Sequence, residues 1–154
     1  MSLKVRYPAP DLQKAITALL SAEQSTPIYD CVPYCKYGTD GKPVLDVDGN
    51  MVPVDLPYMT FGMVECDLSG AKDLAIYDIS QKILLWSEYD GKMELWEIAN
   101  TVVGILSTIP IDLSAARFKI LMASLSPLRA GDAEEYGYQM ELTLTAKIQD
   151  LGGV

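Results

Sequence analysis

The sequence predicts an α+β fold, with an antiparallel sheet of about four core strands, two helices packed on one face and a protruding β-hairpin arm. Two segments carry apolar residues at helical spacing, one segment alternates strictly between apolar and polar residues, and one Asp-Gly pair stands between β-favouring runs. Two helices on one face of such a sheet bury all the apolar faces together. The 154 residues fit a single domain over residues 1–154, which is large enough to fold without a metal or a disulfide.

The first predicted helix follows an extended segment that contains Pro8 and Pro10. Asp11 is placed to act as its N-cap or as an acid in its first turn. Helical spacing then continues to about Ala22, and the apolar positions are Leu12, Ala15, Ile16, Leu19 and Leu20. After this helix, the short apolar run at residues 28–32 predicts a strand.

An arm is predicted at residues 37–56, before the next core strand. Its Asp48-Gly49 pair is a strong hairpin signal, because both positions of such a turn require positive φ. Pro43 and Pro53 cannot donate to a β-ladder, so the flanking runs can only be edge strands. With little domain left to cover this stretch, we expect its apolar residues to contact another subunit, and the alternative is a hairpin folded back on its own sheet. The candidate contact residues are Val44, Leu45, Val47, Met51, Val52 and Val54.

The middle of the chain predicts two strands and the second helix. A strand is expected over residues 57–62, with Cys66 as its outer limit, and another over residues 78–89. The second of these runs is compatible with a helix, but apolar residues on both faces favour a central strand. After a turn at Asp90-Gly91, apolar spacing over residues 95–106 gives the strongest helical pattern in the sequence.

The C-terminal part predicts a strand over residues 118–126, a turn over residues 127–135 and a long final strand over residues 136–149. In the final strand, seven apolar residues alternate with seven polar or small ones, so we expect one face of the strand to be buried and the other to be exposed to solvent. A straight strand of this length would extend roughly 45 Å. We therefore expect it to bend, or to overhang the domain and pair with a neighbour. Residues 151–154 are expected to form a frayed tail.

The charge balance argues against a nucleic-acid-binding protein. The chain has 12 basic and 21 acidic residues and a net charge of −9, whereas DNA affinity comes largely from Lys and Arg. The simplest role of this charge is solubility. Residues 65–94, with seven acids and three bases, are expected to form a solvated face, and the alternative is a wall that repels DNA.

The sequence contains no pattern typical of a signal peptide or a membrane span, so we expect a cytosolic chain with reduced thiols. Three cysteines, Cys31, Cys35 and Cys66, are too few and too irregularly spaced for a zinc site and are expected to be ordinary buried thiols. Trp86 and Trp96 lie in apolar patterns and are expected to pack in the core, although aromatic residues also serve as interface anchors.

No residue pattern predicts catalysis. The sequence has no histidine, which removes the commonest general base and the usual nucleophilic triad, and it has no glycine-rich phosphate loop. The run from Asp46 to Asn50 resembles the start of a calcium loop, but glycine and glutamate are missing from the required positions, so turn formation explains it better. We therefore expect no enzyme activity and assign no catalytic, cofactor-binding or metal-binding residues.

Four sequence runs resemble the bacteriophage tail-completion family, whose members are also called tail terminators or head–tail joining proteins. They are DLQKAITALL at residues 11–20, PIYDCVP at 27–33, LPYMTFG at 56–62 and ILLWSEYDG at 83–91, and the tyrosine-rich final strand completes the resemblance over roughly residues 10–150. The arm departs from the family pattern as an insertion between two strands. These are packing and turn motifs, so they transfer no functional residues.

The resemblance implies a structural virion protein at the head-proximal end of the tail, present in the host cytoplasm before assembly. Such proteins form rings, usually hexamers, on the tail tube protein and present a surface to the head connector protein. Two other classes stay open, namely another phage structural subunit, such as a tube protein or connector adaptor, and a small carboxylate-based enzyme or ligand-binding module.

Overall fold

The protein has the predicted α+β fold, seen in a computed structural model that describes residues 5–70, 75–88, 92–126, 129–133 and 137–152. Residues 129–133 and 137 are described by their backbone alone. The predicted turn at Asp90-Gly91 and the first residue of the final strand, Tyr136, lie outside these ranges. In chain order the elements are α1 (Ala9–Glu23), β1 (Ile28–Tyr29), β2 (Tyr58–Leu68), β3 (Ile76–Ser87), α2 (Met93–Thr108), the 3₁₀ turn η1 (Ser114–Ala116), β4 (Phe118–Leu125), β5 (Arg129–Ala133) and β6 (Gly137–Asp150).

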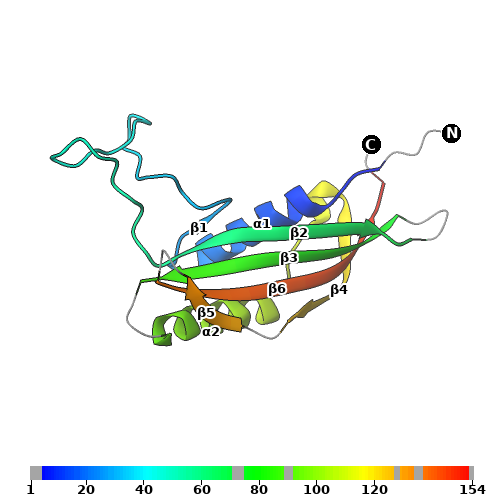
Figure 1. Ribbon diagram of the computed structural model, residues 1–154. Helices are drawn as coiled ribbons and strands as arrows, with labels where there is room; N and C mark the ends of the chain where they lie inside the picture. The colour runs from blue at the N-terminus through cyan, green and yellow to red at the C-terminus, as the bar shows by residue number, and fades with distance from the viewer. Residues whose placement is uncertain (1–4, 71–74, 89–91, 127–128, 134–136, 153–154) are drawn as a thin grey trace.

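One sheet contains all the described strands, in the order β1-β2-β3-β6-β4, with β5 also paired to β6 (Figure 1). The four core strands are antiparallel as predicted. The sheet as a whole is mixed, because β1 runs parallel to β2. A parallel neighbour needs a long crossover connection, and the segment between β1 and β2 supplies it.

The long final strand is confirmed, but it does not overhang the domain. β3 pairs with β6 along residues 138–149, and β4 and β5 share its other side. β6 therefore has partners on both sides, and the alternative in which it overhangs the domain and pairs with a neighbour is wrong. Its length is matched by β3 on one side and by two consecutive strands on the other.

Two strand predictions need correction. Residues 127–135 were expected to form a turn, yet the chain returns to the edge of β6 as β5, because after residues 127–128 it continues alongside the same strand. In the other case, the strand expected at residues 28–32 is only two residues long, since the chain leaves β2 after Tyr29. The apolar composition of residues 28–32 therefore predicted a longer pairing with β2 than the two residues that form it.

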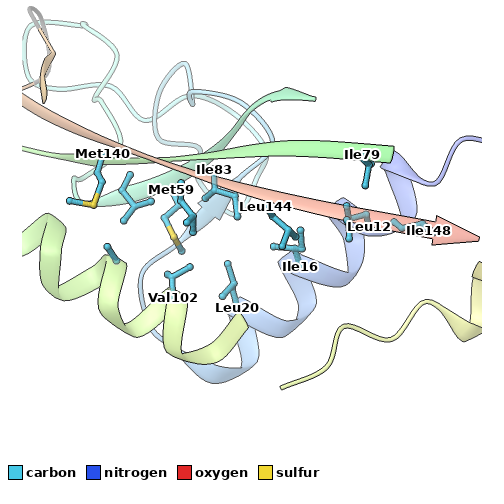
Figure 2. Packing of buried hydrophobic residues seen from close by; sticks show 14 of the residues in the cluster. Leu12, Ile16, Leu20, Met59, Ile79, Ile83, Val102, Met140, Leu144 and Ile148 are labelled. Carbon is cyan, nitrogen blue, oxygen red and sulfur yellow. The ribbon is translucent and has the colours of Figure 1, made fainter. Parts of the chain in front are cut away.

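Both helices cover the same face of the sheet, which we call the helix face. The buried residues of α1 are Leu12, Ile16 and Leu20, and those of α2 are Leu95, Ala99 and Val102. Figure 2 shows Leu12, Ile16, Leu20 and Val102 directed toward buried residues of the three long strands, among them Met59, Ile83 and Met140. In β3 every second residue is buried, as expected for a strand with one covered face.

The opposite face, which we call the open face, carries Trp86, whose side chain is half-buried. Its indole Nε1–H donates a hydrogen bond to Oγ1 of Thr60 over 2.9 Å, and its ring lies 6.5 Å from that of Tyr58. Trp96 is 41% exposed on the surface of α2, so its assignment to the core is wrong. The apolar residues around Trp96 in the sequence did not show that this position lies at the edge of the buried face of α2 rather than at its centre.

A buried glutamine donates a hydrogen bond to a carbonyl oxygen at a β-bulge in β2. The register between β2 and β3 shifts between Phe61 and Val64, which marks a β-bulge. Gln81 is fully buried on the helix face, and its Nε2 donates to the carbonyl oxygens of Lys82 (2.8 Å) and Gly62 (3.3 Å). Gln13 of α1 donates to Oε1 of Gln81 over 2.7 Å. The bulge thus leaves a carbonyl that a polar core residue satisfies.

Near the two ends of the described chain, an arginine holds the N-terminal segment against β6. Arg6 forms a two-point contact with the carboxylate of Asp150, with distances of 2.6 Å and 3.3 Å. The guanidinium also lies 4.3 Å from the centre of the Phe118 ring and donates to the carbonyl oxygen of Ala116. The hydrogen bond from Arg6 holds the pKa of Asp150 below its ordinary value.

Candidate assembly surfaces

The predicted arm, residues 37–56, is part of a longer excursion that connects β1 to β2 (Figure 1). From here on, the arm means this whole excursion, residues 30–57. It extends beyond one end of the sheet, opposite the end at which β6 finishes (Figure 1). Its base is fixed by aromatic contacts, since the rings of Tyr29 and Tyr58 lie 5.7 Å apart in an edge-to-face arrangement. Only Cys35 is buried among residues 30–57. The arm is therefore held by local contacts rather than by the core.

Two tight turns shape the outer part of the arm. In the second, predicted from Asp48-Gly49, Gly49 has φ of 81° and donates to the carbonyl oxygen of Asp46 over 3.1 Å. The expectation of positive φ at both positions is wrong for Asp48, so the turn is present but is of another type. The Asp46 carboxylate accepts hydrogen bonds from the backbone N–H groups of Asp48 and Asn50, both 2.9 Å long. Its oxygen thus completes a turn, as expected for aspartate at this position. The first turn is similar, with Gly41 at φ of 76°.

Three passes of the chain meet at the centre of the arm in a closed triangle of backbone hydrogen bonds. In each case a backbone N–H donates to a backbone carbonyl oxygen: Lys36 to Val52 (2.7 Å), Val52 to Val44 (3.0 Å) and Val44 to Lys36 (2.9 Å). The remaining pairings in the arm are single bridges, Tyr37 with Pro43 and Leu45 with Met51. The arm has a defined backbone but no strand of its own.

Most of the predicted contact residues are exposed on this arm. Val47 at the tip is fully exposed, Leu45 is 57% exposed, and Met51 and Val44 are 43% and 38% exposed. Val52 and Val54 are half-buried. The arm does not fold back on the sheet to cover these side chains. Their role in contact with another subunit stays a prediction.

The three cysteines lie in different environments. Cys35 is buried inside the arm, Cys66 is half-buried on β2, and Cys31 is exposed, so the expectation of three buried thiols is wrong for Cys31. A side-chain hydrogen bond with Cys35 raises the pKa of Tyr37, while burial raises the pKa of the Cys66 thiol. Cys66 lies opposite Ile79 on the helix face and packs against the core.

An open groove of about 850 Å³ lies where the arm meets the sheet. Its walls are mostly apolar and aromatic, and its charged residues are Asp30, Lys36 and Asp55. Lys36 and Asp55 pair with each other over 2.8 Å. A second groove, of about 520 Å³, runs between α1 and the edge of β2, lined by residues that include Gln13, Thr17 and Phe61. Neither groove gathers acids and bases in an arrangement suited to proton transfer.

Within the described part of the chain, the outer strands β1, β4 and β5 and the part of β2 beyond β1 each have an edge without a partner, and the two longest of these edges belong to β4 and β2. β4 pairs only with β6, so its other edge is free. β1 covers β2 only at Met59 and Thr60, so the edge of β2 is free from Phe61 to its end. Neither the free edge of β4 nor that of β2 was predicted from the sequence. A signal existed in β4, whose residues are apolar without clean alternation, and where Leu121 and Met122 are 43% and 62% exposed.

Within the described ranges, no three His, Cys, Asp or Glu side chains lie close enough together to hold a metal ion. No helix in the same ranges has the length and apolar character needed to cross a membrane. Comparison of the sequence with protein-family models and with curated proteins finds no match.

Proposed function

We propose that the chain is a non-enzymatic structural subunit that forms a closed ring at the head-proximal end of a bacteriophage tail, where it caps the tail tube and joins it to the head connector. The observation that carries the assembly part of this proposal is the exposed apolar arm. The phage assignment derives from the four family-like sequence runs over residues 11–91 and the tyrosine-rich final strand.

The arm supports assembly because its conformation is defined while its apolar side chains face solvent. A flexible loop would lose conformational entropy on binding, whereas a segment held by its own backbone hydrogen bonds loses less. Exposed Leu45, Val47 and Met51 therefore form a preorganised apolar surface. In the proposed ring this surface contacts the next subunit or the last ring of the tail tube.

The open face of the sheet supports a role next to passing DNA. Its two central strands carry both polar and apolar residues, and their charges pair across the strands, Lys82 with Glu141 (3.1 Å) and Lys147 with Asp78 (2.8 Å). Both lysines of these two strands are thus paired with carboxylates rather than free to hold phosphates. With the chain's net charge of −9, such a surface can line a channel through which DNA moves without adhering.

Deleting the outer arm tests the proposal. A variant in which a short Gly-Ser linker replaces residues 39–54 should keep the sheet and helices, because these residues bury nothing in the core. In a phage that lacks the wild-type gene, electron microscopy should then show separated heads and tails. The matched control is Met93→Ser, which removes an apolar side chain that is 66% exposed on α2. Normal head–tail joining by the deletion variant would contradict the role of the arm.

The same protein can be distinguished from a tail-tube subunit by light scattering. A tube protein should form cylinders that lengthen with concentration, whereas a terminator should stop at a ring. Growth without limit would move the assignment to the tube-protein class.

A further inference from the structure

The two longest free strand edges lie on opposite sides of the sheet and differ in chemistry. One is the outer edge of β4, and the other is the edge of β2 over residues 61–68. β4 has 8 residues, the same number as this part of β2. The second groove touches this part of β2 only at its first residue, Phe61. Among the described strands none pairs with this edge over residues 61–68, so a strand of the length of β4 can add to β2 beyond β1.

On the helix face, both edges are apolar and incompletely covered. Val64, Cys66 and Leu68 of β2 pair with helix-face residues of β3, yet Val64 and Leu68 are 37% and 48% exposed. On β4, Ile120, Ala123 and Leu125 pair with the buried positions of β6, and they are half-buried or exposed. Joining the two edges would bury both apolar rows against each other, and apolar area removed from water stabilises an interface.

On the open face, the two edges carry opposite charges. Glu65 and Asp67 lie on the β2 edge, and Lys119 lies on the β4 edge, beside Arg117. None of Glu65, Asp67 and Lys119 takes part in an ion pair among the described residues, whereas the central strands pair their charges. The face is thus acidic at one edge, balanced in the middle and basic at the other edge. Pairing β2 with β2 would set acids against acids, which disfavours a two-fold contact.

Strand direction also suits contact between unlike edges. β2, β3, β6 and β4 alternate in direction, so β2 and β4 are antiparallel to each other. Rotation about an axis along the strands keeps these directions and places β4 of one copy antiparallel to β2 of the next. With the ends aligned, Lys119 faces Asp67 and Ile120 faces Cys66. Open-face and helix-face residues then match on both sides.

The backbone groups are in register for this pairing. Ser69 N–H bonds to Ile76 of β3, so by alternation the N–H groups of Val64 and Cys66 point outward. Ser126 N–H bonds to Thr143 of β6, so the N–H group of Ala123 also points outward. Leu151 N–H bonds to the carbonyl oxygen of Arg117, so the backbone groups of Arg117 point toward β6. By alternation, the N–H group of Ile120 points outward. The outward-pointing residues of the two edges are thus those that face each other.

We propose that β4 of one copy pairs antiparallel with residues 61–68 of β2 in the next copy, which joins the sheets of neighbouring subunits into one continuous sheet. This inference rests on the proposed ring, and it supplies the head-to-tail contact that closes such a ring. The arm then contacts a separate surface.

Two edge-blocked variants test the pairing. Ala123→Pro removes from β4, and Val64→Pro from β2, an N–H group that strand alternation directs away from the neighbouring strand of the same subunit. Each substitution should weaken self-association about tenfold or more, because a ladder hydrogen bond and its strand contact are lost. A mixture of the two variants should form dimers and stop, since each has one intact edge, and sedimentation velocity measures this. Ala123→Thr and Val64→Thr keep the N–H and serve as controls, with circular dichroism to verify folding.

A disulfide trap gives a positive signal even where association is weak. In a Cys66→Ser background, the pair Asp67→Cys and Lys119→Cys places cysteines opposite each other on neighbouring copies, within reach of a disulfide. Oxidation should yield a ladder of linked subunits, and each single substitution should yield no more linkage than the background alone. Absence of the ladder would overturn the pairing.

The outcomes separate this inference from the ring proposal. If both proline variants still form rings, the edge pairing is wrong and the ring is made by another surface. If the ladder forms but grows as open chains, with no ring on isolated protein or on tails, the pairing holds and the ring proposal fails. Neither rings nor a ladder would contradict both.

Discussion

The pair of strands β3 and β6 and the arm show opposite ways of fixing a backbone. β3 and β6 pair along their length, and alternate residues of both are buried under the helices. In the arm, residues 30–57, only Cys35 is buried, and the backbone is held by two turns and one triangle of hydrogen bonds. The sheet therefore carries the stability of the subunit, while the arm carries apolar surface that the subunit itself does not use.

This difference predicts that substitutions in the two regions separate folding from assembly. Burial removes apolar area from water, so truncation in the sheet leaves a cavity and lowers the free energy of unfolding. Truncation at the arm tip removes little buried area and should affect only contacts with another molecule.

The largest effect is expected at the centre of β3. Ile83 is fully buried beneath the helices (Figure 2). Ile83→Ala should lower the free energy of unfolding by about 3–4 kcal/mol, because a cavity adds to the lost burial. Urea denaturation measures the change. The matched control is Val47→Ala in the arm, for which a loss above about 0.5 kcal/mol would contradict the contrast between the two regions.

A smaller effect is expected at the polar contact beneath the β2 bulge. Gln81→Leu should lower the free energy of unfolding by about 1–3 kcal/mol, because the Gly62 carbonyl oxygen loses the Gln81 side chain as a donor. Gln139→Leu, on the open face of β6, is the control and should change stability by less than about 0.5 kcal/mol. An equal loss in both variants would show that the Gln81 hydrogen bonds do not matter.

A pH-dependent effect is expected at the Arg6–Asp150 contact. Because Arg6 lowers the pKa of folded Asp150, the contact stabilises the fold at pH values above the ordinary carboxyl pKa, about 4, and this contribution is lost as pH falls through the lowered value. Asp150→Asn should therefore lower stability by about 1–2 kcal/mol at pH 6. The difference from wild type should shrink toward pH 3.

Thermal unfolding of both proteins across this pH range gives the comparison. Asp78 and Asp112 also have lowered pKa values, through Lys147 and Ser114, but they titrate in both proteins and cancel in the difference. A difference that stays constant with pH would exclude the charge of Asp150 as its source.

The smallest effect on stability is expected at the arm tip, where the effect on assembly should be large. Leu45→Ser with Val47→Ser should change the free energy of unfolding by less than about 0.5 kcal/mol, since both side chains are exposed. Head–tail joining should nevertheless fail, as scored by electron microscopy of particles from a complementation assay. Wild-type particle yields would remove these residues from the proposed contact surface.

The elements that could be predicted are those with a signal in their own residues. Spacing of Leu12, Ile16 and Leu20 marks α1, alternation from Tyr138 to Ile148 marks β6, and Asp48-Gly49 marks the second turn of the arm. Whether a given apolar residue is buried or exposed was harder to predict. Trp96 lies next to the buried Leu95, yet it is exposed, because the position of a helix over the sheet sets the limits of its buried stripe.

The candidate contact surfaces were predictable only in part. The arm was found from its turn residues and prolines. The free edges of β2 and β4 were not found, because whether an edge is free depends on which strands lie beside it. β1 leaves β2 after two residues, and β5 continues along β6 after β4, and neither event has a local sequence signature.

By itself, the sequence determined the α+β class, the two helices, the four core strands and the turn of the arm, because hydrophobic period and turn chemistry act over a few neighbouring residues. Tertiary structure alone decided that β6 is central, that a buried glutamine supports the β2 bulge, and that two edges of opposite charge stay open. These features depend on pairing between segments far apart in the chain, where the free energy of each choice is set by the partner and not by the segment itself.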